Sequence, residues 1–112
     1  MGTIDDYLVG LDATDAAVIA HTYDVALEVA PEAVQGFGYG MPALVYRGKS
    51  LLSVMRAKRH FGMYPFSPTA IVAVLPLLDG VDHAKGTIRF TEPLPDDTVR
   101  ALVTARVAEI DG

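Results

Sequence analysis

The stretch Gly36-Phe37-Gly38-Tyr39-Gly40-Met41-Pro42 marks the point at which the hydrophobic pattern of this chain changes its period. Before it, apolar residues recur at helical spacing. Within it, Phe37 and Tyr39 alternate with glycines, a pattern typical of a strand. The stretch has neither the Lys-Ser or Lys-Thr ending of a phosphate-binding loop nor the glycine spacing of a dinucleotide-binding fold. We therefore expect its glycines to shape the backbone at the entry to a hairpin.

Downstream of this stretch, short apolar runs joined by glycine turns predict an antiparallel meander. The turn Gly48-Lys49 separates the first two runs. In the third run, Phe61 and Met63 fall on one face, and His60, Gly62 and Tyr64 fall on the other. A further short run follows the central helix. The predicted strands after the glycine stretch are 43–47, 51–58, 60–64 and 87–90.

Helical patterns flank the meander on both sides. Thr3 and Asp6 resemble a capping box before a short first helix, and Asp12 is a predicted N-cap for the second. Ser67-Pro68 predicts the start of a central helix. The predicted helices are 4–9, 13–30, 68–75 and 97–109. This order predicts an α+β fold, a two-layer sandwich with an antiparallel sheet of about five strands and N-terminal, central and C-terminal helices.

Composition narrows the class of protein further. The 112 residues fit a single domain over residues 1–112, and the 51% of hydrophobic residues can build a core. There is no cysteine, which excludes disulfides and thiolate metal sites. No apolar run approaches the ~20 residues that a membrane helix needs, and the N-terminus does not resemble a signal peptide. We expect a cytoplasmic protein that does not contact membranes.

The charge is unevenly distributed along the chain. The net charge is −5. Residues 1–46 hold no Lys or Arg, whereas residues 47–60 hold no acid. Two surfaces of opposite sign are therefore expected, and the overall negative charge argues against nucleic acid as a partner. The acids of the first block are Asp5, Asp6, Asp12, Asp15, Asp24, Glu28 and Glu32, and the bases of the second are Arg47, Lys49, Arg56, Lys58 and Arg59.

Two groups of residues are candidates for binding chemistry. His21, Asp24 and Glu28 share one face of the second helix and could hold iron or manganese. The simpler interpretation, which we prefer, is that the two acids are the solvated side of that helix. His60 and Tyr64 project from one strand face and are a second candidate site. The positive charge of the nearby Lys58 favours an anion over a metal as the ligand of this site. Here too, the alternative is purely structural. No Gly-x-Ser-x-Gly motif or readable catalytic triad is present, so we expect no enzyme activity.

The segment 70–78 reads Ala-Ile-Val-Ala-Val-Leu-Pro-Leu-Leu and has no polar residue. A surface helix normally has a polar face. Either the domain covers this segment completely, or the segment is an interface between copies of the chain. We favour a homodimer through residues 70–78.

Several ordered motifs together resemble the YdhG-like family (domain of unknown function 1801). They include Thr3-Ile4-Asp5-Asp6-Tyr7, Tyr39-Gly40-Met41-Pro42-Ala43, Ala57-Lys58-Arg59-His60-Phe61-Gly62-Met63-Tyr64-Pro65 and Lys85-Gly86-Thr87-Ile88-Arg89-Phe90. The resemblance covers nearly the whole chain. That family is grouped with frataxin-like proteins, so the resemblance implies an α/β sandwich and a role in iron binding or iron delivery. By position, the implied iron ligands are Asp12, Asp15, Asp24, Glu28 and Glu32.

We therefore expect a non-enzymatic, frataxin-like domain that binds iron weakly through exposed carboxylates. The first alternative is a small-molecule or anion-binding domain with a basic-rimmed pocket, formed by Lys58, His60, Tyr64, Lys85 and Tyr39. The second is a protein-interaction domain that uses the apolar segment 70–78.

Overall fold

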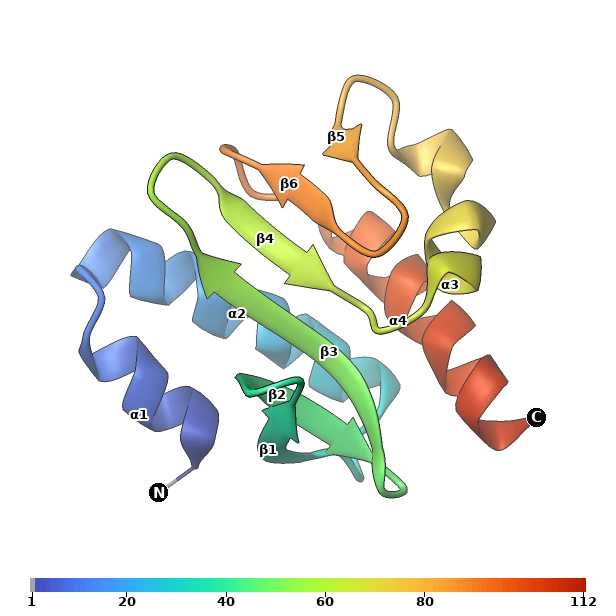
Figure 1. The fold of residues 1–112 in the computed structure, drawn as a ribbon, viewed down its shortest axis with the longest axis horizontal. Helices are drawn as coiled ribbons and strands as arrows, with labels where there is room; N and C mark the ends of the chain where they lie inside the picture. The colour runs from blue at the N-terminus through green and yellow to red at the C-terminus, as the bar shows by residue number, and fades with distance from the viewer. Residues whose placement is uncertain (1) are drawn as a thin grey trace.

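The computed structural model describes residues 2–112, and Figure 1 shows how its helices and strands are arranged. The helices are α1 (Thr3–Val9), α2 (Ala13–Val29), α3 (Pro68–Ala73), the short 3₁₀ helix η1 (Leu75–Leu77) and α4 (Asp96–Asp111). The strands are β1 (Val34–Gly38), β2 (Met41–Tyr46), β3 (Lys49–Arg56), β4 (Phe61–Tyr64), β5 (Asp82–His83) and β6 (Ile88–Phe90). The four predicted helices are confirmed to within one or two residues, except that η1 follows α3 where Pro76 interrupts it.

The strands form one antiparallel sheet in the order β1-β2-β3-β4-β6-β5. The sequence predicted about five strands, and the additional one is β5. It has two residues, with Asp82 opposite Arg89 and His83 opposite Ile88. A strand this short carries no alternating pattern, so the sequence alone does not reveal it.

The α+β two-layer architecture is confirmed. The helices α2 and α4 lie across one face of the sheet, behind it in Figure 1. The core between the two layers includes Ile19 and Leu102 from these helices and Leu52 and Met63 from the sheet, all completely buried. No helix of residues 2–112 packs on the centre of the opposite face, which we call the open face.

The start of α1 differs in detail from the predicted capping box. Gly2 is the N-cap, and the carboxylate of Asp5, not Asp6, accepts a hydrogen bond from the Gly2 N–H at 3.3 Å. Glycine has no side chain with which to cap the helix. The amide oxygen of Gln35 on β1 takes over this role, accepting from the N–H groups of Ile4 at 2.8 Å and Asp5 at 3.0 Å. A partner 30 residues away is invisible to a local sequence motif.

Both hairpins around β2 use two-residue turns with positive φ at both positions. Tyr39 (φ 49°) and Gly40 (φ 78°) join β1 to β2, because Gly38 pairs with Met41. Arg47 (φ 51°) and Gly48 join β2 to β3, so this turn lies one residue earlier than predicted. Such turns match the twist of the strands they join, and they favour Asn, Asp and Gly. A tyrosine or arginine at the first position is unusual.

Two tyrosines complete the hydrogen bonding of β3 beyond the point where its pairing with β2 stops. The β2–β3 pairing does not continue past Leu44 and Leu52, and Pro42 has no N–H to extend it. The Tyr23 hydroxyl accepts instead from the N–H of Val54, and the Tyr7 hydroxyl from the N–H of Arg56, both at 2.8 Å. The helices α1 and α2 are thereby fixed to β3.

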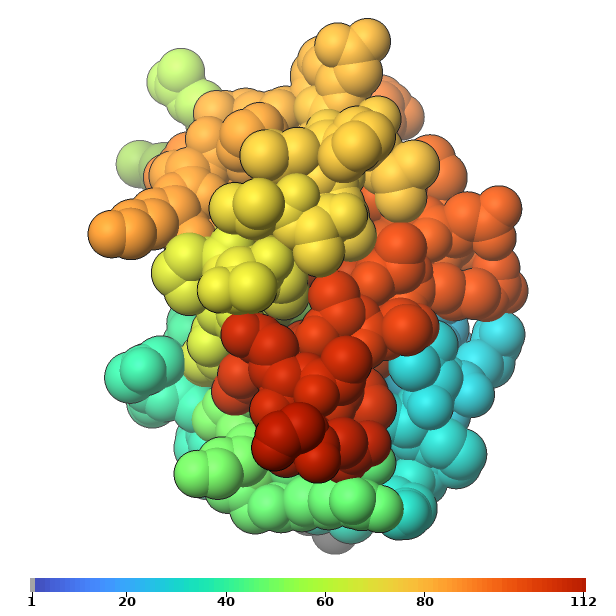
Figure 2. Space-filling view, turned by 90° about the vertical axis from the view of Figure 1, so that its right-hand side faces the viewer, coloured from blue at the N-terminus to red at the C-terminus, as the bar shows by residue number. Residues whose placement is uncertain are grey.

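The apolar segment 70–78 is covered on one side only. Ala70, Ile71, Val74 and Leu78 are buried in the core. Val72, Leu75 and Leu77 are 62%, 41% and 48% exposed. Figure 2 faces this part of the surface, where α3 and η1 (yellow) lie above the C-terminal half of α4 (red). The homodimer through this segment stays a prediction. Within residues 2–112, none of the helices combines the length and the hydrophobicity that a membrane crossing requires.

Candidate functional site

The predicted metal residues on α2 are divided between different partners. His21 Nε2 lies 2.9 Å from Asp96 Oδ1, and Glu28 Oε1 lies 3.2 Å from Arg100 Nη2, both across the α2–α4 contact. Asp24 forms no ion pair within residues 2–112. No group of three or more His, Asp or Glu side chains in this range is arranged to hold a metal ion. The structure therefore does not gather His21, Asp24 and Glu28 into one metal site within residues 2–112.

Two further acids implied by the resemblance have structural contacts. Asp12 caps α2 by accepting from the N–H of Asp15. The carboxylate of Asp15 pairs with Arg56 at 2.9 Å, and the Arg56 guanidinium lies 4.8 Å from the centre of the Phe61 ring. These acids stabilise the junction of α2 with the sheet.

The predicted anion-binding residues separate into two groups. His60 precedes β4 and lines a pocket of about 450 Å³ with residues of β5, β6 and the segment that leads into α4. Tyr64 lies at the far end of β4 and lines a different cleft of about 230 Å³ together with Tyr39. Lys58 and Lys85 are exposed and line neither, although Lys85 immediately precedes Gly86 of the second cleft. The expected single basic-rimmed pocket is not formed.

The second cleft, which we call the aromatic cleft, lies on the open face. Its lining comes from the β1–β2 turn, the start of β2, the segment from β4 into α3, and the β5–β6 loop. At the left of Figure 2, the β1–β2 turn (teal) and the β5–β6 loop (amber) project on either side of the yellow-green segment that leads into α3. The lining residues are Tyr39, Met41, Tyr64, Phe66, Ser67, Pro68 and Gly86.

Glycines in the sheet make room for two of the three aromatic rings. A Cβ at Gly38 would lie 2.6 Å from Cζ of Phe66, and a Cβ at Gly62 would lie 2.9 Å from the Tyr64 hydroxyl. The Phe66 and Tyr64 rings therefore lie directly on the sheet where these glycines have no side chain. Covering the open face accounts for both residues, and it also explains the Gly62–Tyr64 spacing, since residues two apart share a face.

Tyr39 has no such packing role. The residue is 91% exposed, and its ring contacts Phe66 with 5.6 Å between ring centres. Phe66 also has a positive φ of 58°. Only three residues other than glycine have a positive φ in residues 2–112, and two of them are these touching aromatic residues. Sequence reasoning missed Phe66, because nothing in the pattern around Ser67-Pro68 signals a left-handed residue before the helix.

The polar side chains that line the aromatic cleft carry hydroxyl groups, which can donate hydrogen bonds. Of the five tyrosines, Tyr7, Tyr23 and Tyr46 use their hydroxyls in hydrogen bonds within the domain. The hydroxyls of Tyr39 and Tyr64 have no protein partner among residues 2–112. No Asp or Glu lines the cleft. The four bases outside any ion pair in this range are Lys49, Lys58, Arg59 and Lys85.

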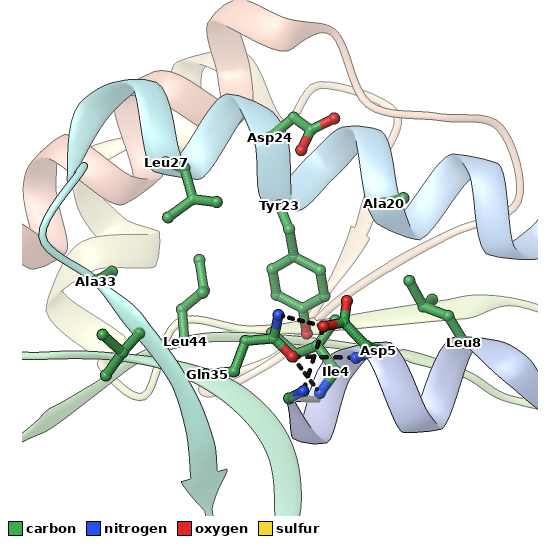
Figure 3. Close-up of a pocket in the computed structure, with 12 residues that line it drawn as sticks. Ile4, Asp5, Leu8, Ala20, Tyr23, Asp24, Leu27, Ala33, Gln35 and Leu44 are labelled. Carbon is green, nitrogen blue, oxygen red and sulfur yellow. Dashed lines mark hydrogen bonds between the residues drawn. The ribbon is translucent and has the colours of Figure 1, made fainter.

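In contrast to Tyr39 and Tyr64, Tyr23 has a buried hydroxyl that forms its hydrogen bonds within the domain. Burial raises the pKa of Tyr23 to about 12, although its hydrogen bonds with the Val54 backbone and the Ser53 side chain oppose the rise. Its ring forms part of another cleft of about 420 Å³, between α1, α2 and β1, which we call the α1–α2 cleft (Figure 3). Tyr23 is therefore a neutral structural residue at physiological pH.

Comparisons with known proteins identify the fold. No family model and no curated protein matches the sequence. Among solved structures, the chain is similar to the crystal structure of YdhG, a protein of the DUF1801 family from Bacillus subtilis, with a TM-score of 0.84 and 14% sequence identity. The match covers 97% of this chain and 91% of the other. The chain therefore has the fold of that YdhG protein, as the sequence motifs led us to expect.

Proposed function

We propose that this protein is a non-enzymatic binding domain, and that the aromatic cleft holds a small planar carboxylate. The observation that carries the proposal is Tyr39. A bulky residue in the left-handed region costs roughly 1–2 kcal/mol relative to a relaxed conformation. Glycine or asparagine would avoid most of this cost at the same position. A tyrosine that packs so little of its surface against its own domain gains little to offset it.

Strained residues of this kind cluster at binding sites, where the surrounding structure holds them in place. The φ of Tyr39 directs its ring against Phe66, which is itself left-handed and packed over Gly38. The two rings thus form a platform whose position is set by the sheet. A preformed platform reduces the ordering cost that a ligand has to overcome.

The chemistry of the lining defines the class of ligand. Aromatic faces bind flat rings through offset stacking. The two tyrosine hydroxyls can donate hydrogen bonds, no acid lines the cleft, and Lys85 is an exposed base that immediately precedes the lining residue Gly86. The volume of about 230 Å³ lies below the range of roughly 300–1,000 Å³ that is usual for small-molecule sites, so the cleft suits a ligand of one ring with one substituent. Together these features favour an aromatic carboxylate.

The absence of enzyme activity is part of the same proposal. The lining residues include no Asp, Glu, His or Cys that could act as a general base. Ser67 is the one lining residue with an aliphatic hydroxyl, and its oxygen caps α3 by accepting from the N–H of Ala70 at 3.0 Å. A serine held in this way has no neighbouring base to activate it.

Isothermal titration calorimetry tests this function with benzoate and two close analogues. Benzamide keeps the flat ring without the charge, and cyclohexanecarboxylate keeps the charge without the flat ring. We expect benzoate to bind more tightly than either. Loss of the stacking in Tyr39→Gly should weaken benzoate by about 2- to 12-fold, the equivalent of ~0.5–1.5 kcal/mol.

Two lysines provide a matched pair of charge variants. Lys85→Gln should weaken benzoate binding severalfold, whereas Lys58→Gln, which removes another exposed charge near the other end of β4, should not. Equal effects of the two lysine variants would mean that benzoate responds only to the overall charge. Unchanged binding in Tyr39→Gly would refute the site itself.

A further inference from the structure

The α1–α2 cleft is separate from the aromatic cleft and lies on the helical side of the domain. Figure 3 shows Tyr23 and Leu27 pointing from α2 toward the sheet, Leu8 rising from α1, and Leu44 from β2. These four side chains, with Ile4, Ala20, Ala33 and Val34, make most of the lining apolar. The volume of about 420 Å³ falls within the range of roughly 300–1,000 Å³ that is usual for small-molecule sites.

One end of this cleft is closed by a fixed polar group. The Gln35 amide oxygen accepts from the N–H groups of Ile4 and Asp5, and its nitrogen donates to Asp5 Oδ2 at 3.0 Å. These bonds are drawn as dashed lines in Figure 3. Gln35 is therefore occupied in holding α1 to β1. The ionised groups left at the cleft are the carboxylates of Asp5 and, on α2 at the rim, Asp24.

Asp24 differs from its neighbours on α2. His21 and Glu28 turn toward α4 and are paired with Asp96 and Arg100. Asp24 shares a helix face with Ala20 and Leu27, four residues before and three residues after it, which both line the cleft. It belongs to no ion pair within residues 2–112. This carboxylate is thus exposed to solvent beside an apolar cavity.

The residues that line the cleft carry charge of one sign only. All twelve lining residues lie between Gly2 and Leu44, and residues 1–46 contain no Lys or Arg. The three bases nearest in sequence, Arg47, Lys49 and Arg56, do not line the cleft, and two of them are engaged elsewhere, since Arg47 pairs with Asp111 and Arg56 with Asp15. An apolar cavity with acidic surroundings favours a cation and repels an anion.

We infer that the α1–α2 cleft binds a small organic amine with a compact apolar body. The apolar body replaces water among Leu8, Leu27 and Leu44, and the ammonium group lies at the rim against Asp24. The charge complementarity and the cavity volume select this class of ligand. The inference is independent of the aromatic cleft, whose lining shares no residue with this one.

Amide chemical-shift titration of the ¹⁵N-labelled protein tests this inference with cyclohexylmethylamine and its neutral analogue cyclohexylmethanol. We expect the amine to shift resonances of α1, α2 and β1 around the cleft, and to bind at least fivefold more tightly than the alcohol. Equal affinity of the two compounds would overturn the role of charge, and shifts outside the cleft would overturn the site.

Asp24→Asn should remove most of the difference between the amine and the alcohol. Asp6→Asn is the matched control, because Asp6 is an exposed acid of α1 that does not line the cleft. Ala20→Leu adds apolar volume inside the cleft and should weaken both compounds. If Asp6→Asn and Asp24→Asn weaken the amine equally, the ammonium group senses only the general negative charge, and the inference is wrong. Tyr39→Gly should leave amine binding unchanged, which separates this test from that of the aromatic cleft.

Discussion

The substitution Tyr39→Gly separates the cost of the strained turn from the use of the ring. Glycine adopts the φ of 49° at position 39 without steric conflict, so the strain of roughly 1–2 kcal/mol is relieved. Two effects oppose this gain. Glycine raises the entropy of the unfolded chain, which lowers the free energy of unfolding by about 0.5–1 kcal/mol. The exposed contact with Phe66, worth about 0.5 kcal/mol, is also lost. We therefore expect the free energy of unfolding to stay within about 1 kcal/mol of the wild type.

Tyr39→Ala gives the sharper comparison. Alanine loses the same ring but keeps the strained φ, so it should be less stable than the glycine variant by about 1 kcal/mol. Arg47→Gly and Arg47→Ala repeat this comparison at a turn with almost the same φ but far from the aromatic cleft. Both substitutions at Tyr39 should weaken benzoate, and neither substitution at Arg47 should do so.

Urea unfolding followed by far-ultraviolet circular dichroism measures these differences, because the chain has no tryptophan. A loss of more than about 1.5 kcal/mol in Tyr39→Gly would refute the reasoning. The Tyr39 ring would then stabilise the fold itself, and the strained backbone would serve to position that ring. Equal stability of the glycine and alanine variants would show that the turn carries no strain.

Three other features of the domain can be tested independently. Tyr23→Phe leaves the buried Val54 N–H without an acceptor, and should lower the free energy of unfolding by about 1–3 kcal/mol near pH 8 in urea titrations. Burial raises the pKa of Tyr23 from 10.0 to about 12, so the unfolded chain loses the Tyr23 proton at a lower pH than the folded chain does. The free energy of unfolding of the wild type should therefore fall as the pH rises from 10 to 12. The variant Tyr23→Phe has no such proton and should lack this part of the fall. Gln35→Ala removes the cap of α1 and should cost about 1 kcal/mol, with faster hydrogen exchange at the α1 amides but not at those of α2. We also propose a homodimer through segment 70–78. Light scattering should give the mass of two chains for the wild type and the mass of one chain for the double variant Leu75→Lys, Leu77→Lys. A monomeric wild type at high micromolar concentration would contradict the homodimer.

Local patterns were sufficient to predict most of the fold. The helical spacing in α2, the Asp12 cap and the Ser67-Pro68 start each depend on residues within a few positions, and the structure confirms them. The two-residue strand β5 and the Gln35 cap of α1 were missed for the opposite reason. Both depend on partners that only the folded chain brings together.

The candidate sites were harder to predict, because a site depends on which side chains converge. Tyr39 and Tyr64 line the same cleft, whereas Lys58 and His60 belong to the other end of β4. Residue spacing alone could not show that His21 and Glu28 would be taken by Asp96 and Arg100 of α4, more than 70 positions later. These contacts divide the predicted triad His21, Asp24 and Glu28 between different partners.

The most direct test of the aromatic cleft is to map benzoate on the ¹⁵N-labelled protein by amide chemical shifts. The proposed function predicts shifts that saturate with a common affinity at Tyr39 to Met41, Tyr64 to Ser67, and Gly86. Shifts centred on Lys58 and Arg59, or no saturable shifts at all, would contradict it.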